Sequence, residues 1–76
     1  MTQYVWSFPS AIGDGTNITG LNWVCEKIPD TGSTTQSTGT VSFTAIHYQD
    51  FATKQYQDLC NLVFATVNQN QIESQL

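Results

Sequence analysis

The chain has 76 residues, a net charge of −4, one histidine and only two other basic side chains, Lys27 and Lys54. Charged residues make up 11% of the sequence, compared with about a quarter of an average soluble domain. Ser, Thr, Asn and Gln together supply 30 residues, and arginine is missing. Because binding of phosphates requires clustered Lys and Arg side chains, this composition argues against a nucleic-acid partner.

The length predicts one domain, residues 1–76, whose core is too small to be very stable without partners. The first residues lack the basic and apolar regions of a secretion signal, and no apolar run reaches the ~18 residues of a membrane helix. We therefore expect a chain that is made in the cytoplasm, keeps Cys25 and Cys60 reduced and does not enter a membrane.

The first predicted strand covers residues 3–8, where aromatic side chains occupy every second position. Proline cannot donate a hydrogen bond to a neighbouring strand, so Pro9 is expected to end it. Residues 10–20 contain three glycines, Asp14 and Asn17. This composition is typical of turns and predicts a loop.

Two further strands are predicted, over residues 21–28 and 40–46, each with large apolar side chains on one face. Residues 31–40 contain no apolar side chain and are predicted to form the hairpin loop that joins them, either a mobile tip or a contact loop. Both edges of such a sheet would be open to strand addition by a neighbour.

Beyond the strands, apolar side chains recur every three or four residues, which predicts a helix from about Thr53 onward. Thr53 or Asp50 is expected to cap its N-terminus, since their side-chain oxygens accept from free amides. Ile72 and Leu76 are expected to form one more short turn. The helical stripe consists of Ala52, Tyr56, Leu59, Cys60, Val63 and Val67.

These elements predict an α+β fold, a small three-stranded antiparallel sheet with one C-terminal helix packed on a face, in the chain order β-β-β-α. Both cysteines lie on faces directed toward the sheet–helix interface and are expected to be buried. The predicted core consists of Tyr4, Trp6, Leu21, Trp23, Val41, Phe43, Tyr56, Leu59 and Val63.

The opposite sheet face is predicted to carry Val5, Val24, Ile28 and Ile46 among polar neighbours. One interpretation is ordinary strand propensity, since Val and Ile favour pleated surfaces even when half exposed. The other is a surface that is buried against further subunits. The four residues are therefore the candidate interface.

Side chains suited to catalysis are few. His47 is the only imidazole, and an apolar setting raises the pKa of a thiol such as Cys25 or Cys60 rather than activating it. The cysteines and the histidine lack the close spacing of a metal site, and the six carboxylates are scattered. We expect no enzyme, no cofactor, no metal ion and no small-molecule substrate.

Three aromatic motifs follow one another along the chain: Tyr-x-Trp-x-Phe at residues 4–8, Asn-Trp-Val at residues 22–24 and Gly-x-Val-x-Phe at residues 39–43. This order, with the ending Ile72-Glu73-x-x-Leu76, resembles a largely uncharacterised family of small tailed-bacteriophage proteins. The resemblance implies a helical C-terminus and a phage setting.

Low charge and a marginal core are typical of a virion structural protein that is stabilised by its neighbours. We expect a capsid cement or decoration protein, located in the virion, that binds the major capsid protein or other virion proteins as a homo-oligomer or through lattice contacts. The alternatives are a neck, tail or baseplate component, and a small host-directed protein that binds and inhibits a bacterial enzyme. Copy number in purified particles distinguishes the three.

Overall fold

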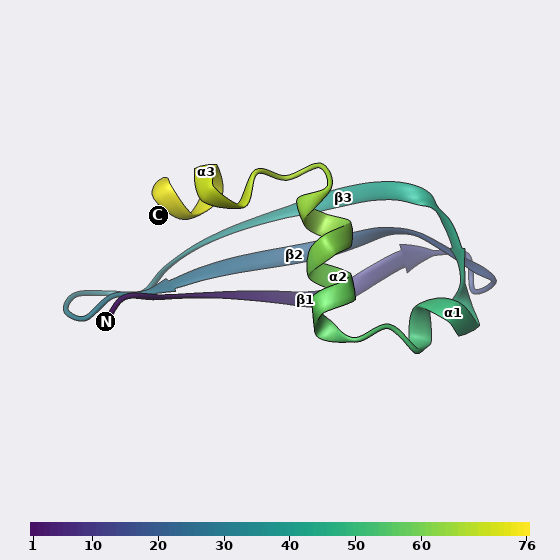
Figure 1. Ribbon diagram of the computed structural model, residues 1–76, viewed down its shortest axis with the longest axis horizontal. Coiled ribbons are helices and arrows are strands. Elements are labelled where there is room, and N and C mark those ends of the chain that lie inside the picture. The colour runs from purple at the N-terminus through teal and green to yellow at the C-terminus, as the bar shows by residue number, and fades with distance from the viewer.

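The computed structural model describes all of residues 1–76 and contains three long strands followed by three short helices. The elements are β1 (Gln3–Gly13), β2 (Asn17–Ile28), β3 (Thr35–His47), α1 (Tyr48–Ala52), α2 (Tyr56–Phe64) and α3 (Gln69–Ser74). The strands form one antiparallel sheet in the order β1-β2-β3, which confirms the predicted α+β class. Because the strands have 11 to 13 residues, the molecule is elongated and measures 44 × 19 × 17 Å (Figure 1).

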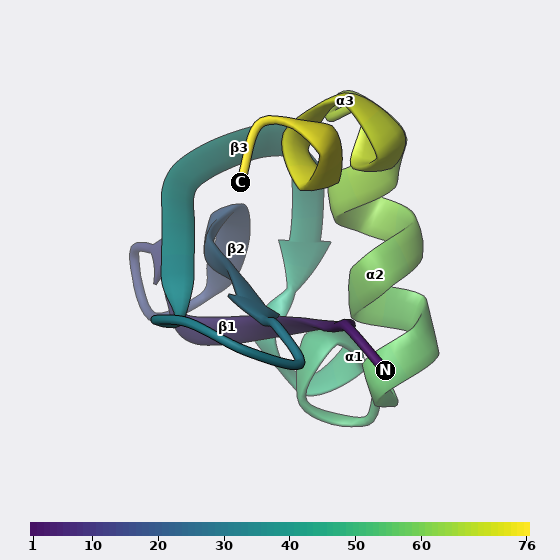
Figure 2. The same cartoon turned by 90° about the vertical axis from the view of Figure 1, so that its left-hand side faces the viewer.

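The helices cover one face of the sheet. Figure 1 shows α2 crossing the strands near their middle, and Figure 2 shows α2 and α3 on the same side of the sheet. No helix lies over the middle of the opposite face (Figure 2). None of the three helices has the length and hydropathy that a membrane crossing requires.

The prediction that Pro9 ends the first strand is wrong. Ser7 pairs with Val24 and Ser10 pairs with Asn22, so Phe8 and Pro9 together lie opposite the single residue between those two partners. This is a β-bulge. Because β1 is an edge strand, the missing N–H of Pro9 costs no sheet hydrogen bond and the strand continues beyond it to Gly13.

The predicted loop over residues 10–20 is reduced to a tight turn at residues 14–16. The Asp14 carboxylate accepts hydrogen bonds from the amides of Thr16 (2.9 Å) and Asn17 (2.8 Å), and these bonds lower its pKa. Gly15 adopts a positive φ of 91°, which glycine reaches without steric cost. Only the centre of the predicted loop over residues 10–20 therefore forms a turn, and the residues on either side belong to β1 and β2.

The predicted loop over residues 31–40 is also shorter, because β3 already begins at Thr35. Its polar residues pair with β2 from Lys27↔Thr35 to Asn22↔Thr40. Threonine is β-branched and favours strands although it is not apolar. The sequence nevertheless predicted a loop here, because the segment lacks the alternation of apolar and polar residues that identifies a strand.

The helical region is divided into three segments rather than one. Thr53 ends α1 and Asp50 lies inside it, so neither caps the main helix. His47 caps α1 through its Nδ1, which accepts from the Gln49 amide at 3.3 Å. The main helix, α2, begins after Gln55, whose amide donates to the Asp58 carboxylate at 3.1 Å. The expected extra C-terminal turn is α3, which begins after Asn68.

The core lies between the sheet and α2 and is small, since only nine of the 76 residues are buried. The rings of Trp6 and Trp23 are 5.2 Å apart, and Phe64 packs edge-on against Trp6 at 4.8 Å. Tyr4 and Tyr56 were predicted in the core but are 39% and 50% exposed. Both side chains are amphipathic and can pack at the edge of a core, and the Tyr56 hydroxyl donates to the Trp6 carbonyl oxygen. The buried cluster consists of Trp6, Leu21, Trp23, Cys25, Val41 and Val63.

Candidate interaction surface

The sheet face that α2 does not cover, which we call the open face, is built from the positions that alternate with the core residues of each strand. It consists of Gln3, Val5, Ser7, Ser10 and Ile12 of β1, Gly20, Asn22, Val24, Glu26 and Ile28 of β2, and Gln36, Thr38, Thr40 and Ser42 of β3. Among these positions Glu26 alone is charged. The open face is therefore almost neutral in a protein of net charge −4.

Three of the four candidate interface residues lie together at one end of the open face. Val5 pairs with Glu26, and Val24 and Ile28 are the next residues on the same face of β2. Val5 and Ile28 are 43% and 38% exposed, and Val24 is half-buried. Ile46 is separated from them because it pairs with Ile18, beyond an irregularity in the β2–β3 register.

Ile12 is an open-face residue that the sequence analysis missed. It lies over Gly20, where an added Cβ would come within 3.4 Å of its side chain, and it remains 43% exposed. The sequence signal for this position was the alternation of polar Ser10 with apolar Ile12, which is typical of a strand. It was missed because the glycines that follow favoured the prediction of a loop. The open face thus has an apolar group at each end, Val5, Val24 and Ile28 at one and Ile12 at the other.

A polar row crosses the middle of the open face. The side-chain Nδ2 of Asn22 donates to the Ser10 hydroxyl at 2.6 Å, and the Thr40 hydroxyl donates to the side-chain Oδ1 of Asn22 at 2.7 Å. All three strands contribute one residue to this row. A hollow of about 280 Å³ adjoins it and is lined by Pro9, Asn22, Trp23, Val24, Thr38, Gly39 and Thr40. Such a row can exchange hydrogen bonds with an incoming protein surface at little desolvation cost, because it carries no charge.

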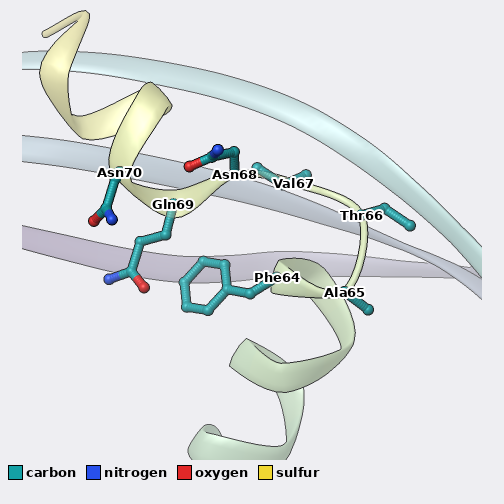
Figure 3. A pocket seen from close by; sticks show the side chains of 7 residues that line it. All are labelled: Phe64, Ala65, Thr66, Val67, Asn68, Gln69 and Asn70. Carbon is teal, nitrogen blue, oxygen red and sulfur yellow. The ribbon is translucent and has the colours of Figure 1, made fainter.

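The largest hollow, of about 430 Å³, lies where α2 passes into α3 and is lined by residues 64–70 alone (Figure 3). Figure 3 shows the ring of Phe64 beside the Gln69 side chain. The Asn68 side chain is engaged in capping α3, where it accepts from the Gln71 amide at 3.1 Å. None of the seven lining residues is ionisable, so this hollow has no group that could transfer a proton or act as a strong nucleophile.

Both cysteines are buried and free, as the sequence predicted. Burial raises the pKa of the Cys25 thiol from 9.0 to about 11, and the nearby Glu73 carboxylate adds to this effect. Burial and the neighbouring Cys60 thiol raise the pKa of the Tyr56 phenol. A thiol held in its protonated form is a poor nucleophile, so this cluster contributes to packing.

These pKa shifts predict a loss of stability at alkaline pH. A raised pKa means that the unfolded chain releases its proton first, so the stabilisation is fully present below about pH 9 and is lost as the pH rises toward 11. We expect the free energy of unfolding, measured by urea denaturation, to fall between about pH 8 and about pH 10.5. The Cys25→Ala variant should show a shallower fall. Equal slopes for the two proteins would contradict the assignment to Cys25.

The remaining ionisable side chains are dispersed. His47 caps α1, and the N-terminal amine pairs with Asp30 at the surface. No three His, Cys, Asp or Glu side chains lie close enough together to hold a metal ion. Glu73 accepts from the Trp6 indole at 2.9 Å and from Gln69 at 3.0 Å, so its carboxylate joins α3 to β1.

In comparisons with protein-family models, curated proteins and solved structures, no match to the chain was found.

Proposed function

We propose that the chain is a phage virion structural protein, specifically a capsid cement or decoration protein that stabilises the capsid lattice. The phage setting rests on the aromatic motifs at residues 4–8, 22–24 and 39–43. The role as an interaction module rests on the geometry. The observation that carries it is the open face, a complete, nearly uncharged sheet surface left uncovered in a domain with only nine buried residues.

The dimensions of the open face suit a stable contact. The molecule is 44 Å long and 19 Å wide, and stable interfaces bury about 800 Å² on each partner. Apolar groups at both ends would supply hydrophobic burial, and the polar row between them would supply hydrogen bonds and register. A partner on this face would add to a core that is marginal by itself.

Stabilisation of a capsid then follows from mass action. A protein that binds only the assembled lattice stabilises it by RT ln(1 + [L]/Kd), which is about 2.7 kcal/mol for each site when the free protein is at 100 times its Kd. Many weak sites therefore add to a large effect. The net charge of −4 favours the outer capsid surface, since packaged DNA would repel it.

The experiment is a charge placed on the open face. We expect Val5→Asp to reduce incorporation into particles at least tenfold, because binding would bury an unpaired carboxylate. Val5 is 43% exposed in the isolated domain and pairs with Glu26, so the new carboxylate should destabilise the fold by no more than about 1 kcal/mol and leave it folded. Incorporation is measured by quantitative mass spectrometry of purified particles, with circular dichroism as the check on folding.

The matched control is Gln57→Asp, which adds the same charge at an exposed position of α2, away from the open face. It should be incorporated normally. If Val5→Asp is folded and incorporated as well as this control, the open face is not the binding surface.

A further inference from the structure

We infer that the outer edge of β3 is a self-association site, at which β3 of a second copy of this chain adds in antiparallel orientation to make one continuous sheet. The inference deepens the proposed function and rests on it for its biological setting. It names the partner of one sheet edge, whereas the open face is the surface proposed to meet the capsid.

The two edges of the sheet differ. On β1, Pro9 has no N–H, and the bulge opposite Trp23 interrupts the strand. The carbonyl oxygen of Trp6 is occupied by the hydroxyl of Tyr56, which donates to it from α2. Proline, bulges and covering groups are the devices by which natural sheets block strand addition. The β1 edge is therefore protected.

Between Thr35 and Ser42 the β3 edge has neither a proline nor a bulge. From Thr35 to Ser42 it pairs with β2 without any shift of register, and this run contains no proline. No charged side chain occurs between Asp30 and Asp50. Outside its pairing with β2, no backbone hydrogen bond involves a β3 residue. Alternate N–H and C=O groups along the outer edge are therefore free to pair with another strand.

A second copy fits this edge because the strand is self-complementary. Two antiparallel copies of β3 exchange the same donors and acceptors about a two-fold axis. With Gly39 at the axis, Thr38 faces Thr40 of the second copy, and neutral Thr–Thr pairs on adjacent strands are favourable. Glu26, the charge on the open face, lies on β2 and is one strand removed from the seam. Each Glu26 pairs with Gln36, three residues from the axis. Two such carboxylates would therefore lie three strand spacings apart across the sheet and six residues apart along it, about 25 Å in all, which exceeds the Debye length of about 8 Å.

The test measures mass in solution by sedimentation equilibrium, without particles. We expect the native chain to dimerise, at twice its 8.4 kDa, and Thr38→Lys/Thr40→Lys to be monomeric, because it sets like charges opposite each other across the seam. The control is Ser7→Lys/Ser10→Lys. Ser7 and Ser10 flank the same β2 residues as Thr38 and Thr40 but on the protected edge, so this variant should remain dimeric.

Mixing supplies a second readout. Thr38→Glu/Thr40→Glu should also be monomeric alone, and an equimolar mixture with the lysine variant should restore the dimer. The inference is overturned if the native chain is still monomeric at about 0.1 mM, because the dissociation constant of the dimer would then be at least about 0.1 mM. It is also overturned by a dimer that only the β1-edge variant dissociates. If the native chain is monomeric and the β3 lysine variant fails to enter particles while the β1 lysine variant, which also places two charges on the open face, enters normally, the edge binds a strand of another protein. If the dimer is confirmed and no variant alters particle binding, only the proposed function fails.

Discussion

Replacing Trp6 with alanine is expected to unfold most of the domain at room temperature. Trp6 is 5% exposed, contacts the rings of Trp23 and Phe64, and donates from its indole to Glu73. Removal of a buried Trp side chain costs about 3–5 kcal/mol. A domain of this length has a total stability of roughly 4–11 kcal/mol at 0.05–0.15 kcal/mol per residue. With only nine buried residues, this domain is expected near the lower end of that range, where the loss equals the whole stability.

Two companion variants separate the contributions of Trp6. Trp6→Phe keeps a ring but removes the indole N–H, so it should cost less than the alanine variant while freeing α3 from β1. Tyr48→Ala removes an aromatic side chain that is 54% exposed and should change stability by less than about 0.5 kcal/mol. Urea denaturation followed by far-ultraviolet circular dichroism measures all three. A Trp6→Ala protein within about 1 kcal/mol of the native one would contradict the assigned core.

The second large effect is expected at Gly39, where the backbone of β3 supports Trp23. An added Cβ would lie 2.5 Å from the indole ring, much closer than carbon atoms can approach. Gly39→Val should therefore displace Trp23 or the strand, and overpacking of this kind costs about 1–3 kcal/mol. Thr38→Val is the control, since it places the same side chain one residue away at an exposed position.

A double-mutant cycle tests the cause. In Trp23→Leu the ring is absent, so the added cost of Gly39→Val should fall by more than about 0.5 kcal/mol, the usual limit of additivity between sites that do not interact. If the energies of the two variants simply add, the cost of Gly39→Val does not come from its contact with Trp23. Denaturation midpoints with unchanged m-values give these energies directly.

The elements with regular patterns could be predicted from the sequence. Alternation at Leu21, Trp23 and Cys25 identified the central strand and its buried face, and the spacing of Leu59, Cys60 and Val63 identified α2. These signals persist because burial imposes a period of two on a strand and about 3.6 on a helix. The burial of both cysteines followed from the same periods and is confirmed.

The ends of the strands could not be predicted, because they lack a buried face on which alternation would be visible. Thr35 to Thr40 is polar on both sides, and it becomes a strand only through pairing with β2. Pro9 was read as a terminator because its position at an edge depends on the strand order, which a local pattern does not contain. The division of the helical region at Lys54 and Gln55 depends on a capping contact with Asp58, which periodicity also does not reveal.

The positions of the four candidate interface residues in the sheet were predicted in part. Val5, Val24 and Ile28 share the open face because they alternate with core residues, and this follows from strand period alone. Ile46 was assigned to the same group by that rule, but the irregular register near Ile18 separates it from the others. Irregularities of register change the face and position of every later residue, and only the structure locates them.

The copy number of the chain in purified phage particles tests the central claim most directly. The particles are those of the phage that is proposed to encode the chain, and quantitative mass spectrometry gives the ratio of the chain to the major capsid protein. A cement or decoration protein should be present in hundreds of copies for each particle, on the order of the number of lattice sites it stabilises. A few to a few dozen copies would assign it instead to the neck, tail or baseplate. Its absence from particles would contradict a virion structural role and favour a host-directed inhibitor.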